Sequence, residues 1–192
     1  MARGIKYIPH SRPDFNKDVS LLNLLLRNVR EGNIAELERE FANYIGARHC
    51  CFANSARSAL YLVYKALKLE GEVIVSPLTC LAAIFPMVFC GLKPRFVDID
   101  SQTFNMDPQK VKEAISEDTV AIQPIHLAGN PCDMNTIKNI AEANKLLIIE
   151  DCAQSLGAEY LGKKIGGDIA CFGFLKSFIN IHFQFRNFSR NN

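Results

Sequence analysis

Residues 146–154 read Leu-Leu-Ile-Ile-Glu-Asp-Cys-Ala-Gln, an apolar run that ends in two acidic residues. Such a run is typical of a buried strand in a parallel sheet. A carboxylate at the end of a buried strand needs a partner, because an unpaired buried charge is costly. For Asp151 the residues leave three partners open: a cationic ligand nitrogen, a metal ion, or nearby backbone N–H groups. We expect no metal site, since the spacing of His126 and Glu150 matches no metal signature.

Short apolar runs of the same kind alternate with helical patterns along the chain. Strands are expected at 49–53, 72–75, 95–97, 120–125, 146–149 and 169–174, and helices at 20–30, 33–45, 55–68, 79–89, 108–115 and 133–144. Alternation at this spacing predicts crossover units and a mainly parallel sheet. The fold class is therefore α/β with a mainly parallel sheet, and residues 1–33 form an N-terminal arm and helix that precede it.

In open parallel sheets, ligands bind where the strands end. The residues that follow the expected strands form a candidate site: Asn54, Ser55, Ser76, Pro77, Asp98, His126 and Asp151. Residues 54–58 read Asn-Ser-Ala-Arg-Ser at a helix start, where free N–H groups favour a phosphate. An ordinary helix cap at Ser55 explains the same residues. His126 is interpreted as a hydrogen-bonded residue at the edge of the crevice.

Composition and charge exclude several classes of partner. The chain has 192 residues, of which 48% are hydrophobic and 22% charged, as in ordinary globular proteins. Its longest apolar stretch, residues 80–92, contains Pro86 and is too short to span a membrane, so we expect a buried helix there. The net charge of +2 arises from basic residues beyond Asp168, where no acidic residue occurs. We therefore expect neither a membrane nor a nucleic-acid partner.

Two further patterns concern nucleotides and thiols. No Gly-x-Gly-x-x-Gly follows the first strand, and residues 157–164 lack the Ser or Thr that a P-loop requires, so they predict a hairpin-like turn. Seven cysteines occur, an odd number without any Cys-x-x-Cys pair. Together with the lack of a secretory signal, they indicate reduced thiols and a cytoplasmic protein.

Seven segments in one order resemble the DegT/DnrJ/EryC1/StrS family of pyridoxal-phosphate-dependent sugar aminotransferases. They lie at 40–46, 55–60, 71–75, 91–100, 126–131, 149–158 and 167–172. The resemblance covers about residues 34–174 and implies the three-layer α/β/α large domain of fold type I. It implies that residues 34–177 are an incomplete large domain and that the C-terminal small domain is missing.

The resemblance assigns cofactor roles to four residues. Ala56 and Arg57 align with the family's Gly-Thr, whose backbone N–H groups hold the phosphate of the cofactor. Asp151 aligns with the acid beside the pyridine nitrogen, and Gln154 with the residue near the ring oxygen. Pyridoxal phosphate is therefore the expected cofactor.

Three positions depart from the family pattern. Cys80 stands where many relatives place an aromatic ring, and Gly173 where they have a phosphate-binding serine. The lysine that bonds the cofactor is expected at Phe178, whereas the nearby lysine is Lys176, two residues earlier. Residues 178–192 are expected to be an unrelated or out-of-frame tail, with a divergent edge strand carrying Phe183 and Phe185 as the alternative.

The function implied by the resemblance is transfer of an amino group from glutamate to a keto carbon of a nucleotide-linked sugar, by a homodimer. Because the lysine is displaced, we expect this chain to be inactive or barely active and to bind the cofactor weakly. Two alternatives stay open. One is a related sugar dehydratase, which would have a histidine at the lysine position, although His182 lies four residues late. The other is a noncatalytic binding or regulatory module with the same fold.

Overall fold

The computed structural model describes residues 33–167, 169–173 and 183–185. Its centre is a parallel sheet of four strands in the order β3-β2-β4-β5. These strands are β2 (Glu72–Val75), β3 (Lys93–Phe96), β4 (Thr119–Gln123) and β5 (Leu147–Ile148). The edge strand β3 contains Pro94 between Lys93 and Arg95, residues that discourage pairing with another sheet. The predicted mainly parallel sheet is confirmed.

The apolar run 146–149 and its acidic end form one continuous path across the sheet. β5 leads through Ile149, whose N–H donates to the carbonyl of Ile122, into β6 (Glu150–Cys152). β6 pairs in parallel with β9 (Ala170–Phe172) and forms a bridge with the chain beyond β4. The sheet therefore extends from β3 to β9, and the predicted strand at 146–149 continues three residues further.

Residues at the two ends of the described chain pair with each other. β1 (His49–Cys51) pairs antiparallel with β10 (Phe183–Phe185). This pairing agrees with the edge-strand alternative for these residues, whereas 178–182 and 186–192 lie outside the described residues. Lys176 and the expected helix at 20–30 lie outside them as well.

The helices begin and end within about two residues of the expected positions. They are α2 (Ile34–Ile45), α3 (Ala56–Leu67), α4 (Leu81–Phe89), α5 (Pro108–Ala114) and α6 (Met134–Ala143). Four of them start at a polar side chain that accepts a hydrogen bond from the first turn: Asn33, Ser55, Asp107 and Asp133. α4 starts at Cys80, which makes no such bond.

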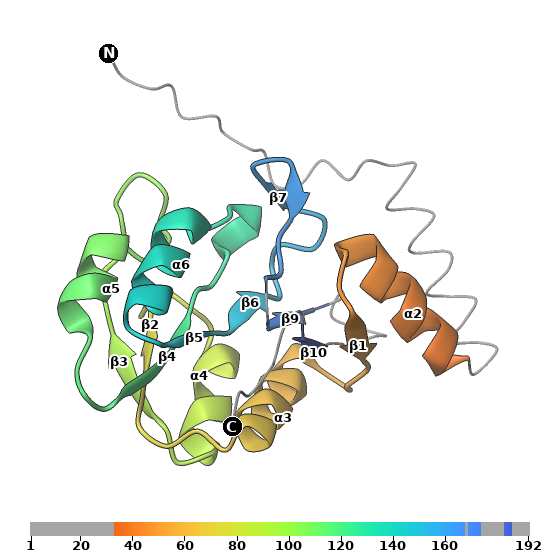
Figure 1. Ribbon diagram of the computed structural model, residues 1–192, viewed down its shortest axis with the longest axis horizontal. Coiled ribbons are helices and arrows are strands. Elements are labelled where there is room, and N and C mark those ends of the chain that lie inside the picture. The colour runs from red at the N-terminus through yellow and green to blue at the C-terminus, as the bar shows by residue number, and fades with distance from the viewer. Residues whose placement is uncertain (1–32, 168, 174–182, 186–192) are drawn as a thin grey trace.

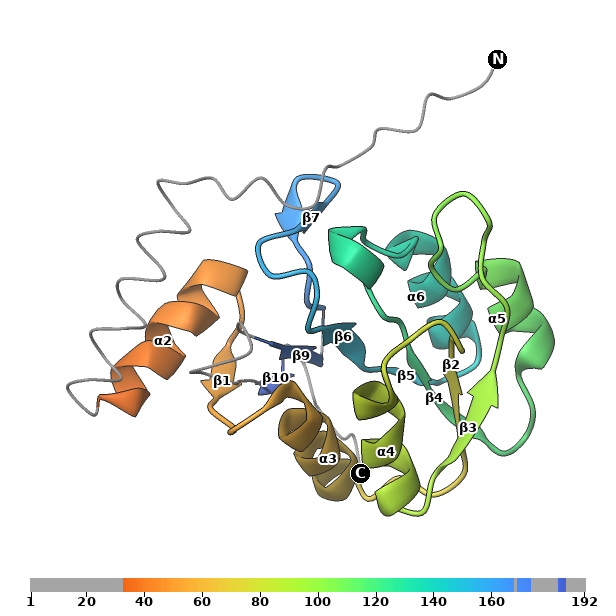
Figure 2. The same ribbon diagram turned by 180° about the vertical axis from the view of Figure 1, so that it is seen from behind.

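The helices cover the sheet on both faces, as Figures 1 and 2 show. Val73, Val75 and Ala121 are buried with α3 and α4, whereas Ile74 and Ile122 are buried with α5 and α6. Successive strand residues point to opposite faces, so fully apolar strands fill both cores. The predicted three-layer α/β/α architecture is confirmed.

A third cluster joins α2 to the end of the sheet. Leu37 and Phe41 of α2 pack with Phe172 of β9, and the rings of Phe41 and Phe172 meet edge to face at 5.4 Å. β7 (Glu159–Tyr160) and β8 (Lys163–Lys164) form a hairpin beside this cluster. The hairpin predicted for residues 157–164 is confirmed.

The cysteines and α4 complete the fold. All seven cysteines are free thiols. The expectation of a buried helix at 80–92 is only half correct, because Leu81, Phe85 and Phe89 of α4 are exposed while Ile84 and Met87 face the core. None of the helices in the described part of the chain has the length and apolar character that a bilayer crossing requires.

Candidate functional site

Asp151 is the middle residue of the short strand β6 and has 5% of its surface exposed. Strand alternation places its side chain on the same face as Ile149, which packs with α3 and α4. Within the described residues, its carboxylate accepts one hydrogen bond, from the N–H of Ala153 at 3.0 Å. Burial raises the pKa of Asp151, and the Ala153 N–H offsets only part of that effect. A cationic ligand nitrogen would supply the missing partner.

The first turns of α3 and α4 lie at the same edge of the sheet as Asp151. Each of these helices runs back from the carboxyl edge, because β2, β4 and β6 are parallel. The cap at Ser55 is confirmed, since its Oγ accepts from the N–H of Ser58 at 3.0 Å. The described residues provide no acceptor for the N–H groups of Ala56 and Arg57, the first two of α3. Free donors and the helix dipole suit a phosphate here.

Gln154 lies three residues beyond Asp151, and a hydrogen bond from another loop holds its side chain. Its Oε1 accepts a hydrogen bond from the N–H of Ala128 at 3.1 Å. Ala128 belongs to the short 3-10 turn Leu127–Gly129 and has a left-handed backbone with φ of 52°. The turn after His126 therefore fixes the orientation of Gln154.

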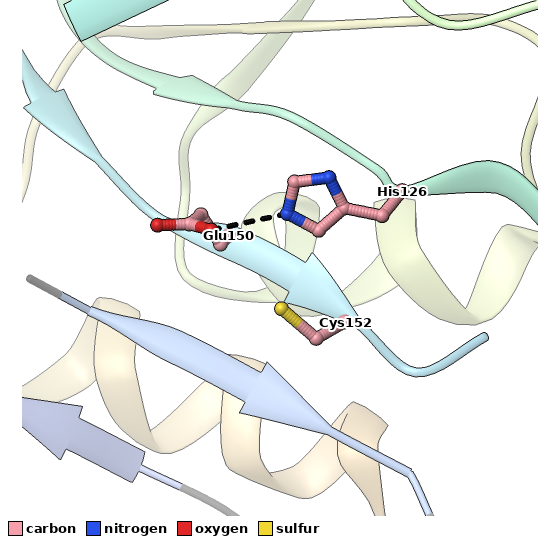
Figure 3. Close-up of side chains that lie close together, drawn as sticks. All are labelled: His126, Glu150 and Cys152. Atoms are coloured by element: carbon pink, nitrogen blue, oxygen red, sulfur yellow. Dashed lines mark hydrogen bonds and ion pairs between the residues drawn. The ribbon is translucent and has the colours of Figure 1, made fainter. Parts of the chain in front are cut away.

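His126, Glu150 and Cys152 form a buried cluster on the opposite face of β6, drawn in Figure 3. The Nε2 atom of His126 lies 3.0 Å from a carboxylate oxygen of Glu150. The N–H of Cys132 donates to Nδ1 of the same ring at 3.1 Å. The interpretation of His126 as a hydrogen-bonded residue is confirmed, but the residue is fully buried rather than at the edge of a crevice.

The hydrogen bonds and the protonation states of these three side chains are unfavourable for binding a metal ion. A metal on Nε2 would leave Nδ1 needing a proton, yet Nδ1 already accepts the N–H of Cys132. Burial raises the pKa of Cys152 to about 12, so no thiolate is available at neutral pH. Burial would also raise the pKa of Glu150, but hydrogen bonds from His126, Gly167 and Gly166 outweigh it and lower the value. The cluster is a satisfied hydrogen-bond network.

Sequence reasoning missed this network and a second one beneath the site. Tyr64 of α3 donates to Oε1 of Gln123 in β4, whose Nε2 donates to the carbonyl of Ala83 in α4 at 3.2 Å. Tyr64 lies within an apolar helix face and Gln123 within an apolar strand. A polar residue inside an apolar run was the signal that could have revealed it.

The departures from the family pattern can be placed in part. Cys80 is an exposed residue at the start of α4, at the same edge as Asp151. A side chain on Gly173 would approach the carbonyl oxygen of Ala153 to 3.2 Å, so the serine of the family would fit tightly here. Phe178, like Lys176, lies outside the described residues.

Comparison with known proteins agrees with this geometry. The model of the DegT/DnrJ/EryC1/StrS aminotransferase family matches residues 24–178. GDP-perosamine synthase of Caulobacter vibrioides is 43% identical over 145 residues, which cover 73% of this chain and 39% of that protein. GDP-4-keto-6-deoxy-D-mannose 3-dehydratase of Yersinia pseudotuberculosis is 36% identical over 158 residues, covering 78% of this chain and 40% of that protein.

A solved structure gives the same result. The putative sugar aminotransferase Spr1654 from Streptococcus pneumoniae, in its PMP form, superposes with a TM-score of 0.77 at 26% identity and covers 87% of this chain and 50% of that one. The chain spans less than two thirds of the length of these relatives. By its sequence match and its fold, this chain belongs to the DegT/DnrJ/EryC1/StrS aminotransferase family.

Proposed function

We propose that this chain is the cofactor-binding part of a pyridoxal-phosphate-dependent aminotransferase that moves an amino group from glutamate to a keto carbon of a nucleotide-linked sugar. The observation that carries the proposal is the buried carboxylate of Asp151, which has one hydrogen-bond donor within the described residues and stands at the edge where α3 begins. Two matched relatives are named for nucleotide-linked sugars, and the matched structure for sugar amination.

The residues at this edge fit the cofactor by their chemistry. The N–H groups of Ala56 and Arg57 would hold its phosphate, and the Arg57 guanidinium would add a positive charge. Asp151 would accept a hydrogen bond from the pyridine nitrogen and keep that nitrogen protonated, while Gln154 would lie near the ring oxygen. When bound, pyridoxal phosphate supplies the electron-withdrawing ring that the reaction needs.

The position of the lysine limits the activity we propose. Lys176 stands two residues before the family position, which here is Phe178. A lysine displaced by two residues reaches the cofactor only if the chain takes a different path, so we propose that this chain has little or no transaminase activity. Weak binding through α3 and Asp151 would persist.

Reduction with borohydride tests the proposal directly. The chain is mixed with pyridoxal phosphate, bound cofactor is measured by its absorbance, and the reduced protein is mapped by mass spectrometry. We expect saturable binding that Asp151→Asn weakens at least about tenfold, because the variant loses a charge-assisted hydrogen bond. No binding by the wild type would refute the proposal. A reduced adduct on Lys176 would refute the predicted inactivity, and tight binding without adduct would favour the noncatalytic module.

We further propose a homodimer in the cytoplasm, where the free thiols remain reduced. Its support is a row of exposed apolar side chains on one side of α4: Leu81 at 62%, Phe85 at 41% and Phe89 at 69% exposure. Rows of this kind mark interaction surfaces. We expect Leu81→Lys with Phe89→Lys to convert a dimer into a monomer in light scattering. Leu161→Lys, at the exposed hairpin tip, is the control; a persisting dimer would exclude this face.

A further inference from the structure

Glu150 precedes Asp151 in β6, and its side chain lies on the opposite face of the sheet with 2% exposure. Its carboxylate accepts three hydrogen bonds: from Nε2 of His126 at 3.0 Å, from the N–H of Gly166 at 3.0 Å, and from the N–H of Gly167. A Cβ on Gly167 would collide with this carboxylate. Three hydrogen-bond donors therefore hold the side chain of Glu150 in place next to Asp151.

His126 is bonded both to Glu150 and to Asp151. Its ring reaches Glu150, while its backbone N–H donates to the carbonyl of Asp151 at 3.2 Å. The N–H of Asp151 in turn donates to the carbonyl of Pro124 at 2.8 Å. These side-chain and backbone hydrogen bonds thus connect the two strand ends beside Asp151, whose carboxylate is proposed to bind the cofactor.

The same histidine anchors the turn that orients Gln154. Nδ1 of His126 accepts the N–H of Cys132, so both ends of the segment 126–132 are held by one ring. Within that segment, the N–H of Ala128 donates to Gln154. Because Nδ1 accepts the N–H of Cys132, we place the ring proton on Nε2, which donates it to Glu150.

We propose that Glu150 and His126 are positioning residues of the cofactor site: by fixing the end of β6 and the 126–132 segment, they hold Asp151 and Gln154 in the geometry that binds the cofactor ring. This inference rests on the proposed function. Neither residue touches the cofactor face of the sheet, since Glu150 points away from Asp151 by strand alternation.

The hydrogen-bond directions predict what a near-isosteric change does. In Glu150→Gln, the amide oxygen can replace the carboxylate oxygen that accepts from His126 and Gly166, but the amide nitrogen then faces the N–H of Gly167. In the opposite orientation, the amide nitrogen faces both Nε2–H of His126 and the N–H of Gly166. In that second orientation, moving the ring proton to Nδ1 relieves the clash at His126 only by opposing the N–H of Cys132, and the clash with Gly166 stays. With glutamine, every arrangement therefore leaves at least one N–H of the network without an acceptor. His126→Asn removes the imidazole that bonds to both Glu150 and Cys132.

Affinity for pyridoxal phosphate, measured on the full chain, tests the inference. We expect Glu150→Gln and His126→Asn each to raise Kd about tenfold or more, and the double variant to match the singles, because both remove one unit. Val111→Ala in α5, buried but remote from the site, is the control for lost stability. It should lower the melting temperature and leave Kd within about twofold.

Two spectroscopic measurements separate positioning from stability. With pyridoxal phosphate labelled at the ring nitrogen, we expect the 15N resonance of a protonated nitrogen in wild type and Val111→Ala, and its loss or shift in Glu150→Gln. In the chain without cofactor, we expect His126 to show the Nε2–H tautomer. Wild-type Kd in Glu150→Gln, or an Nδ1–H tautomer, would overturn the inference. Absence of binding by the wild type would instead overturn the proposed function, and the tautomer would still test the network.

Discussion

The hydrogen bond from Tyr64 to Gln123 allows a stability prediction that can be worked out from the structure. Tyr64 is 1% exposed and Gln123 is fully buried, so water cannot replace a lost partner. Tyr64→Phe removes the donor and leaves Oε1 of Gln123 unpaired. Such a group costs about 2 kcal/mol, which for a chain of this size corresponds to a fall in melting temperature of roughly 6 °C.

A double-mutant cycle checks the cause of that loss. Gln123→Met removes the acceptor and leaves the Tyr64 hydroxyl unpaired, while the carbonyl of Ala83 stays in the α4 helix. The double variant Tyr64→Phe, Gln123→Met buries no unpaired member of the pair, so we expect it to be more stable than the sum of the single losses by about 1 kcal/mol or more. Urea unfolding followed by circular dichroism gives the four free energies. Additive losses, or a Tyr64→Phe variant as stable as wild type, would refute the reasoning.

Three further predictions concern the turns and the site. Gly71→Ala should cost at least about 2 kcal/mol more than Gly91→Ala in urea unfolding, because both have positive φ but only the Cβ at 71 would collide with a carbonyl oxygen, that of Asp118. Asp151→Asn should have a higher melting temperature than wild type at pH 7. Burial raises the pKa of Asp151 from 3.8, so the wild type loses stability as the pH rises and this carboxyl group ionises. The difference in melting temperature should vanish below about pH 4, where the carboxyl group is protonated. Gly173→Ser should lower stability by about 1 kcal/mol, owing to the 3.2 Å approach to Ala153, yet tighten phosphate binding in cofactor titrations.

Local patterns predicted the elements of this fold well. The strand path that leads to Asp151 follows from the four apolar residues 146–149, and the α3 cap follows from Ser55 at the start of an apolar helical face. Each of these signals lies within a few residues of the structure that it predicts. The layer arrangement then followed from the alternation of strands and helices.

The hydrogen-bond networks could not be predicted in this way. His126 and Glu150 are 24 residues apart, and Tyr64 and Gln123 are 59 apart, so their contacts depend on the register of neighbouring strands and helices. The same limit explains why the helix at 80–92 was expected to be buried. Its composition is apolar on every side, and only the packing decides that Phe89 faces outward.

Glu150 and Asp151 are adjacent carboxylates of one strand that differ in their hydrogen-bond partners and in the direction of their pKa shifts. Both are buried, yet Glu150 has three hydrogen-bond donors and a lowered pKa, whereas Asp151 has one donor among the described residues and a raised pKa. A fully paired carboxylate holds the structure, and an underpaired one costs stability until a cation arrives. Since alternation places only Asp151 on the face where α3 begins, that cost falls where a phosphate-bearing, cationic ligand would be bound.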